Sequence, residues 1–348
     1  MSVPKHILVI RLSAPGDVAM TGPVLHSFQQ EFPSIKLTIL TNSRLAPLFT
    51  GLNASLFFAE TKTQHKGFAG LFKLFNQLNA ANKDQPIDAV ADLHNVLRSQ
   101  IIRRLYRLKG IKTAAIDKGR AEKKQLTRKE NKVLQILPTS FGRYRNVFRK
   151  LGFNFSFEFN SIFATKPTLT SDILLLTGKK NNKWIGVAPF AAYKEKMYPL
   201  EKMEEVIIQL KAGENKKIIF FGSAADAETL NQWEKKFEGT VNVAGKLTLE
   251  QELLLMSQLD VMVSMDSANM HFASLVNVPV VSVWGATHPY AGFLGWNQQL
   301  NNAVQSELYC RPCSVFGSKP CYRGDWACMN LILPFMITEK INGILDTE

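Results

Sequence analysis

Polar residues follow two apolar runs in the stretch 264–289, and their types suit a sugar nucleotide. Asp266 ends an apolar segment that we expect to be a buried strand, and Gly285-Ala-Thr287 follows a second expected strand, Val278–Trp284. Folds of the α/β class bind ligands at the carboxyl ends of parallel strands. An aspartate there can accept hydrogen bonds from sugar hydroxyls, while the turn offers backbone N–H groups and a hydroxyl to a phosphate. The alternative is an ordinary strand–helix–strand crossover with a solvated aspartate.

A second candidate site follows the first expected strand, His6–Ile10. The sequence Arg11-Leu-Ser-Ala-Pro-Gly-Asp17 comes next, and a helical pattern then covers Val18–Phe32. The proline and glycine require a tight turn, which places Asp17 at the start of the helix. Asp17 is then either an N-cap, whose oxygen accepts a backbone N–H, or a general base at the mouth of a cleft.

Strand and helix patterns alternate along the chain and predict an α/β protein with two similar halves. In the first half, the remaining expected strands are 36–41 and 87–93, and the expected helices are 43–50, 67–79, 99–108 and 144–151. A stretch with little periodicity, 157–172, is the candidate linker. In the second half, the expected strands are 185–189, 217–221, 240–243, 261–265 and 278–283, with helices at 201–211, 225–237 and 248–258. We therefore expect domains over 1–170 and 171–330, and a C-terminal helix over 331–348 that packs on the first domain.

Four motifs in a fixed order make the chain resemble glycosyltransferase family 9, the heptosyltransferases that extend the inner core of lipopolysaccharide from ADP-heptose. They are RLSAPGD, KMYP, VAGKLTLEQELLLMSQLD and MDSANMH…VPVVSVWGATHP, within about residues 5–335. The resemblance implies the GT-B fold, with two facing Rossmann-like domains and a cleft between them. It also implies inverting transfer from a nucleotide-sugar co-substrate with no cofactor, in the cytoplasm of a Gram-negative bacterium.

The resemblance assigns the site residues. Asp17 matches the family's catalytic base. For donor binding, the resemblance implies Lys196, Asp266, Ser267, His271, Gly285 and Thr287. The turn at Gly245 lies at a further strand end, and Asp226 or Glu228 could hold a ribose hydroxyl or simply favour the first turn of its helix.

Departures from the family pattern leave the donor open. Tyr198 replaces a tryptophan, Ala268 replaces a glycine, and Phe190-Ala191-Ala192 replaces polar residues before the lysine. The last change removes hydroxyl contacts to the donor. Another nucleotide sugar or another glycan acceptor is therefore the alternative function.

Positive charge is concentrated in one segment. The chain carries a net charge of +13, and residues 98–150 hold seventeen Lys and Arg against three acidic residues. Such a concentration implies an anionic partner. A phosphorylated glycolipid acceptor at the inner membrane face fits, with peripheral contact between protein and membrane. Nucleic acid fits on charge alone, but the segment has few aromatic residues for stacking. A solvated basic surface without a ligand is the third interpretation.

Five residues of the first half are candidates for acceptor binding. They follow the expected strand 87–93 or lie on the next helix: Asp92, His94, Arg98, Arg103 and Arg104. Each could equally be an ordinary surface or core residue.

All four cysteines lie near the C-terminus, at Cys310, Cys313, Cys321 and Cys328. This clustered set includes a C-x2-C pair, so a structural zinc site is one interpretation. Disulfides are uncommon in the cytosol, and the family often carries such a tail without needing a metal for chemistry.

Other sequence features exclude further classes. The sequence has no run of eighteen apolar residues, so we expect no membrane-spanning helix. The first apolar stretch is too short for a signal peptide, and we therefore expect a cytoplasmic protein. A nicotinamide oxidoreductase would need G-x-G-x-x-G after a strand, where this chain has Ser-Ala-Pro-Gly-Asp.

Overall fold

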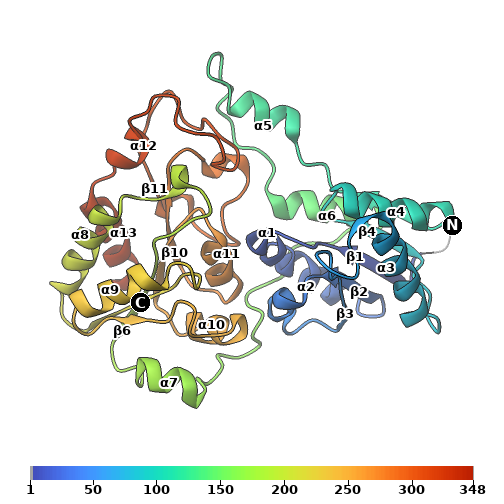
Figure 1. The fold of residues 1–348 in the computed structure, drawn as a ribbon, viewed down its shortest axis with the longest axis horizontal. Helices are drawn as coiled ribbons and strands as arrows, with labels where there is room; N and C mark the ends of the chain where they lie inside the picture. Colours follow the sequence, from blue (N-terminus) through green and yellow to red (C-terminus); the bar gives the residue numbers. More distant parts are fainter. Residues whose placement is uncertain (1–2, 348) are drawn as a thin grey trace. The chain divides into compact units, whose positions relative to one another are not determined.

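The computed structural model describes residues 3–347, and these divide into two compact units (Figure 1). Unit 1 comprises residues 1–118 and 140–162, and unit 2 comprises residues 119–139 and 163–348. The expected boundary after residue 170 lies close to the transition at Phe163. The assignment of 119–139 to unit 2 was not expected from the sequence.

Unit 1 is built on a five-stranded parallel sheet in the order β3-β2-β1-β4-β5. The strands are β1 (His6–Ile10), β2 (Lys36–Thr41), β3 (Ala54–Phe58), β4 (Ala89–Asp92) and β5 (Lys112–Ala115). The helices are α1 (Pro15–Ala19), α2 (Gly22–Glu31), η1 (Ser43–Phe49), α3 (Gly67–Ala81), α4 (Leu97–Leu108) and α6 (Ser140–Leu151). The predicted bounds of β1 and β2 are confirmed, and β3 and β5 were missed.

Packing in unit 1 explains why these helices form. Apolar residues of α3 and α4, such as Leu74 and Ile102, share one core with Leu8 and Val90 of the sheet. Elsewhere Phe28 of α2 packs against Phe148 of α6, with ring centroids 4.7 Å apart. The expected helix 18–32 is instead two helices, because Pro23 in the first turn of α2 has no N–H for a continuous helical ladder.

Unit 2 is built on a six-stranded parallel sheet in the order β11-β10-β9-β6-β7-β8. The strands are β6 (Lys183–Ala188), β7 (Lys216–Phe220), β8 (Val241–Asn242), β9 (Val261–Met265), β10 (Val280–Trp284) and β11 (Ala303–Gln305). The α-helices are α5 (Arg120–Leu126), α7 (Ser171–Thr177), α8 (Leu200–Lys211), α9 (Ala227–Lys236), α10 (Leu249–Met256), α11 (Ala268–Leu275), α12 (Ala327–Asn330) and α13 (Pro334–Leu345). Short 3₁₀ helices are η2 (Lys194–Lys196), η3 (Pro289–Ala291) and η4 (Leu300–Asn302).

The start of α10 shows how sequence fixes one of these helices. Thr248 Oγ1 accepts a hydrogen bond from the Gln251 N–H, and Gln251 Oε1 accepts one from the Thr248 N–H. This reciprocal capping satisfies two backbone donors at the helix start. The expected start of this helix at residue 248 is confirmed.

The C-terminal helix α13 packs on α8 in unit 2, not on the first domain as expected. Its buried Ile337, Ile341 and Leu345 are spaced four residues apart and belong to the core of unit 2. Thr338 Oγ1 also donates to Gln209 Oε1 of α8 over 3.0 Å. The apolar stripe of α13 thus completes the core on the helix side of this sheet.

The basic segment is divided between the two units. Eleven of its seventeen Lys and Arg belong to unit 1, and six belong to residues 119–139 of unit 2. Lys132 Nζ donates to the carbonyl oxygens of Cys310 and Pro312 over 2.9 and 2.8 Å, and the Leu137 N–H donates to the Tyr290 carbonyl over 2.9 Å. These contacts tie 119–139 to unit 2.

Within residues 3–347, no helix is long and apolar enough to cross a membrane.

Ile341→Ala should lower the free energy of unfolding of unit 2 by about 2–5 kcal/mol, because it leaves a cavity in a packed core. All five tryptophans lie in unit 2, so tryptophan fluorescence in a urea titration reports its unfolding. Leu175 of α7 is 85% exposed, so Leu175→Ala as the control should change stability by less than about 0.5 kcal/mol. Equal, small effects of both changes would show that α13 is not part of this core.

Candidate donor and catalytic sites

The carboxyl ends of β6, β9 and β10 bring three loops of unit 2 together. β6 pairs with β9 and β9 with β10, all in parallel, so the three following loops leave the same edge of the sheet. Lys196 Nζ in the loop after β6 lies 3.0 Å from Asp266 Oδ2 after β9. Their side chains are only 14% and 8% exposed. The structure therefore joins two of the predicted donor residues in a buried ion pair.

The turn after β10 lies against the same loop. The Ala286 N–H donates to the Glu195 carbonyl over 3.1 Å, one residue before Lys196. A Cβ on Gly285 would stand 2.9 Å from that carbonyl oxygen, so this close approach requires glycine. Thr287 is fully buried, and its Oγ1 has no hydrogen-bond partner among the described residues. A buried hydroxyl without a partner is costly and is suited to a ligand.

Gly317 and Arg311 complete these surroundings, and neither was predicted. A Cβ on Gly317 would collide with the stem of Lys196. The Arg311 guanidinium donates to the carbonyls of Gly285 and Thr287 over 2.5 and 3.0 Å. Neither residue stands in a recognisable polar motif, and their partners are backbone atoms or a side-chain stem, so sequence alone offered no signal.

Two further predicted donor residues flank the start of α11. Ser267 Oγ lies 3.2 Å from Ser264 Oγ and immediately precedes the helix, while Asp266 N–H donates to the Val283 carbonyl over 3.3 Å. His271 is buried within α11, 7% exposed. These contacts hold the β9–α11 connection in one conformation.

The loops after β7 and β8 carry the remaining donor candidates. Gly245 has a φ of +71°, and a Cβ there would lie 3.0 Å from Ala224 Cα, so the two loops approach each other closely. Asp226 Oδ2 accepts from the N–H and hydroxyl of Ser223 over 2.8 and 2.7 Å. Asp226 thus holds its own turn, and Glu228 is exposed in the first turn of α9.

In unit 1, a buried arginine orients Asp17. Arg11 Nη2 lies 2.5 Å from Asp17 Oδ2, and Arg11 Nη1 donates to the Leu93 carbonyl over 2.7 Å. The Tyr144 hydroxyl donates to the backbone carbonyl of Asp17 over 3.2 Å. The N-cap of α1 is Ala14, so the capping interpretation of Asp17 is wrong. The Asp17 side chain is 32% exposed and its carboxylate is held by Arg11, which suits a general base.

The candidate acceptor residues divide by burial. Asp92 is fully buried, accepts from the N–H groups of His94 and Asn95, and pairs with Arg103 at 3.3 Å. Burial, with the nearby Arg11 cation, lowers the pKa of His94 to about 3, so this ring is neutral. Asp92 and His94 are thus buried, whereas the Arg103 side chain is 20% exposed, and direct contact of these three residues with the acceptor stays a prediction. Of the five candidates, the exposed ones are Arg98 and Arg104.

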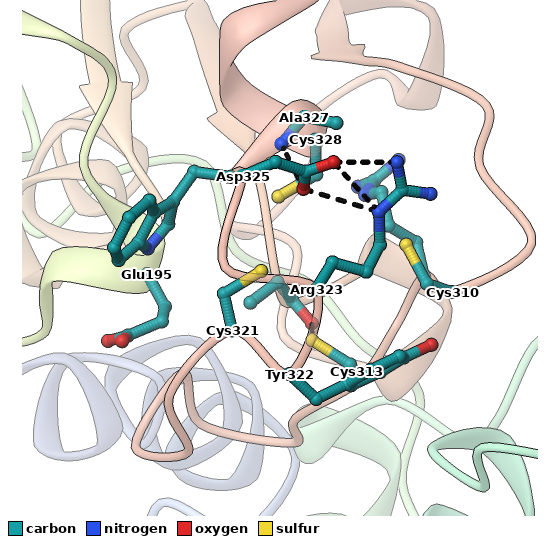
Figure 2. A pocket seen from close by; sticks show the side chains of 12 residues that line it. Glu195, Cys310, Cys313, Cys321, Tyr322, Arg323, Asp325, Ala327 and Cys328 are labelled. Carbon is teal, nitrogen blue, oxygen red and sulfur yellow. Dashed lines mark hydrogen bonds and ion pairs between the residues drawn. The ribbon is translucent and has the colours of Figure 1, made fainter.

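The four cysteines are free and, with Tyr322, line one pocket of unit 2 (Figure 2). Arg311 lines the same pocket. Across residues 3–347, no group of three or more His, Cys, Asp or Glu side chains is placed to hold a metal ion. Burial raises the pKa of the Cys313 thiol, and that of Cys328 to about 11, so both thiols are protonated at neutral pH.

The fold is that of an α/β protein with two parallel sheets. Each sheet has an ion-paired aspartate beyond the carboxyl end of a strand, Asp17 in unit 1 and Asp266 in unit 2. The profile of glycosyltransferase family 9 (heptosyltransferase) matches residues 72–321. The chain belongs to this family and is a glycosyltransferase of the GT-B fold class.

Individual relatives agree with this membership. The lipopolysaccharide core heptosyltransferase OpsX of Haemophilus influenzae is 27% identical over 302 residues, 82% of this chain and 80% of that protein. Among solved structures, the family 9 glycosyltransferase of Veillonella parvula superposes with a TM-score of 0.75 at 19% identity, over 100% and 99% of the two chains. Escherichia coli heptosyltransferase WaaC with ADP-2-deoxy-2-fluoro heptose gives 0.66 at 18%, over 97% and 99%.

A double-mutant cycle with Lys196→Met and Asp266→Asn should give a coupling free energy of about 1–3 kcal/mol in unfolding, because each single change leaves a buried charge without its partner. The matched control is the more exposed pair Lys236–Glu204, whose side chains are 54% and 25% exposed. Lys236→Met with Glu204→Gln should couple by about 0.2–1 kcal/mol. Equal coupling in the two cycles would contradict the burial of the Lys196–Asp266 pair.

Proposed function

We propose that the protein transfers a heptose, with inversion, from ADP-heptose to an inner-core acceptor of lipopolysaccharide. The observation that carries this proposal is the buried Lys196–Asp266 pair beside the Gly285–Thr287 turn, which offers a cation, a carboxylate and a hydroxyl at one sheet edge. Relatives named as lipopolysaccharide heptosyltransferases, and a related fold described with an ADP-heptose analogue, support it.

The donor contacts follow from the chemistry of these groups. Lys196 would contact the diphosphate and Asp266 the sugar hydroxyls, with Thr287 Oγ1 donating to a phosphate oxygen. The leaving ADP gains negative charge as the bond from the anomeric carbon to phosphate oxygen breaks. Cations and donors fixed in a buried setting stabilise that charge without having to reorganise.

Asp17 acts on the acceptor in this scheme. Its carboxylate takes the proton from an acceptor hydroxyl as that oxygen forms the new bond to the anomeric carbon, and ADP leaves with the electron pair of the broken bond. A single displacement inverts the anomeric configuration. Arg11 holds the carboxylate in place, while the 32% exposure of its side chain leaves an oxygen accessible.

The alternative within the same chemistry is a different nucleotide sugar or glycan acceptor. Phe190-Ala191-Ala192 offers no hydroxyl in the loop that carries Lys196, so the donor contacts differ there from the usual family pattern. The nucleotide base and the acceptor hydroxyl are the finer points of the proposal.

Peripheral contact with an anionic membrane at the cytoplasmic face is part of this proposal. Residues 119–139 carry exposed basic side chains, such as Arg128 and Lys129, close in sequence to the exposed apolar Val133, Leu134 and Ile136. Basic and apolar side chains together suit the headgroup region of an anionic bilayer. An acceptor anchored in that bilayer would then be held near the enzyme.

Asp17→Asn should reduce turnover by about two to four orders of magnitude while leaving ADP affinity unchanged, because the amide cannot accept the acceptor proton. Transfer assays with ADP-heptose and a delipidated inner-core acceptor measure the first, and calorimetry the second. Asp84 is an exposed aspartate of the same unit, and Asp84→Asn should leave turnover unchanged. Full activity of Asp17→Asn per folded molecule would remove Asp17 from the mechanism.

Exposed arginines of α4 should contribute to acceptor binding. Changing Arg104 and Arg107 together to glutamine should raise the acceptor KM by about threefold to tenfold at low salt, with a smaller effect at higher ionic strength because exposed charges are screened. The donor KM should not change. In the matched control, Arg149 and Lys150 on α6 are replaced. These changes remove the same charge from exposed positions of unit 1. If both double variants raised the acceptor KM equally, only the net charge would matter and α4 would have no specific role.

A further inference from the structure

Arg311 is a buried cation whose partners are all neutral oxygens. Arg311 is only 4% exposed to solvent. Its guanidinium donates to the backbone carbonyls of Trp284, Gly285 and Thr287 over 3.0, 2.5 and 3.0 Å, and also to the Ser306 carbonyl. The remaining acceptor is Gln305 Oε1, 3.0 Å from Nη2.

No carboxylate among the described residues forms an ion pair with this guanidinium. Burial lowers the pKa of Arg311 to about 10, so the guanidinium remains charged at neutral pH. Two carboxylates, Glu195 and Asp325, line the same pocket, but Glu195 forms no ion pair with Arg311 and Asp325 pairs with Arg323 at 2.7 Å (Figure 2). The nearby thiols of Cys313 and Cys328 are neutral because burial raises the pKa of both. A buried charge without a counter-ion is costly, and a bound anion would offset that cost.

The same contacts set the direction of the turn's peptide groups. In a trans peptide the N–H points opposite to the C=O. With the carbonyls of Trp284, Gly285 and Thr287 directed at Arg311, the N–H groups of the residues that follow them point away from it. One of these, the Ala286 N–H, donates to the Glu195 carbonyl beside Lys196. This N–H is therefore engaged by the loop that carries Lys196, while the Gly285 carbonyl of the same peptide group is held by Arg311.

Lys196 alone leaves the donor surroundings without net charge. Its ammonium is paired with Asp266 at 3.0 Å, so the two charges cancel at a distance. Arg311 has no such ion-pair partner, and its charge therefore contributes to the electrostatic potential at the Gly285–Thr287 turn. Through neutral peptide groups, a buried charge acts over several ångströms because the interior screens it weakly.

We propose that Arg311 is a positioning residue for the donor diphosphate: it fixes the turn 284–287 through the carbonyls of Trp284, Gly285 and Thr287 and supplies a buried positive charge beneath the ligand. This rests on the proposed function, in which the turn contacts the diphosphate. Arg311 itself does not touch the donor in this account. It acts through the peptide groups that it holds.

Gln305→Glu tests the charge without removing Arg311. The carboxylate keeps the acceptor oxygen at Nη2 but neutralises the guanidinium. Calorimetric affinity for ADP should fall by about tenfold, since roughly one opposing charge is added near the diphosphate. Affinity for adenosine, which has no phosphate, should stay within about twofold. The melting temperature should be unchanged or higher, because a buried cation gains a partner.

The control is Gln299→Glu, which adds the same charge at an exposed position of unit 2 and should leave both affinities unchanged. Unchanged ADP affinity in Gln305→Glu, or an equal loss for ADP and adenosine, overturns the proposal and leaves Arg311 a purely structural residue. Two further variants separate charge from geometry. Arg311→Lys keeps the positive charge but loses the planar guanidinium that donates to several carbonyls, whereas Arg311→Met loses both. The ratio of ADP to adenosine affinity should therefore be retained better in Arg311→Lys than in Arg311→Met. If wild-type protein does not bind ADP, the proposed function fails together with this inference.

Discussion

The ion pair between Lys196 and Asp266 is the interaction on which the donor side depends. It exists because β6 and β9 run in parallel with Ala188 opposite Ser264, so the loops that follow them leave the sheet at one edge. Neighbouring backbone is shaped around it. Gly317 leaves room for the lysine stem, and Gly285 lets the next turn approach the Glu195 carbonyl. A larger residue at either glycine would separate the loops that the pair holds together.

Each unit holds an aspartate in an ion pair, and the two aspartate side chains differ in their exposure to solvent. In each, an aspartate after the end of a strand is held by a cation: Asp17 by Arg11 in unit 1, and Asp266 by Lys196 in unit 2. The Asp17 side chain is 32% exposed, whereas that of Asp266 is 8% exposed. A group that exchanges a proton with an incoming hydroxyl needs an accessible oxygen, while a group that orients a bound sugar can remain buried. The difference in exposure agrees with the different roles proposed for them.

Sequence reasoning succeeded where one strong local pattern decided the outcome. The continuous apolar runs of β1 and β2 gave their bounds, and Thr248 gave the start of α10. It failed for β3, which has no fully buried residue. The amphipathic stripe of α13 showed that the helix must pack, but not on which sheet, because that depends on contacts distant in sequence.

The candidate site shows the same limit. Asp266 and the turn after β10 could be predicted as neighbours, because parallel strands align their carboxyl ends, and Lys196 was assigned through the family resemblance. Arg311 could not, because its acceptors are mostly carbonyl oxygens that every residue type carries. The burial of Asp92 also could not be read from the sequence, since its partners are backbone N–H groups and Arg103.

The most direct measurement is product analysis after incubation of the wild-type protein with a delipidated inner-core acceptor and, in parallel, ADP-heptose or UDP- and GDP-linked sugars. Mass spectrometry detects the added sugar, and proton NMR reports the configuration at its anomeric carbon. The account predicts one heptose added from the ADP-linked donor, release of ADP, and inversion of the anomeric centre. Transfer only from a UDP- or GDP-linked sugar, or retention of configuration, would contradict it.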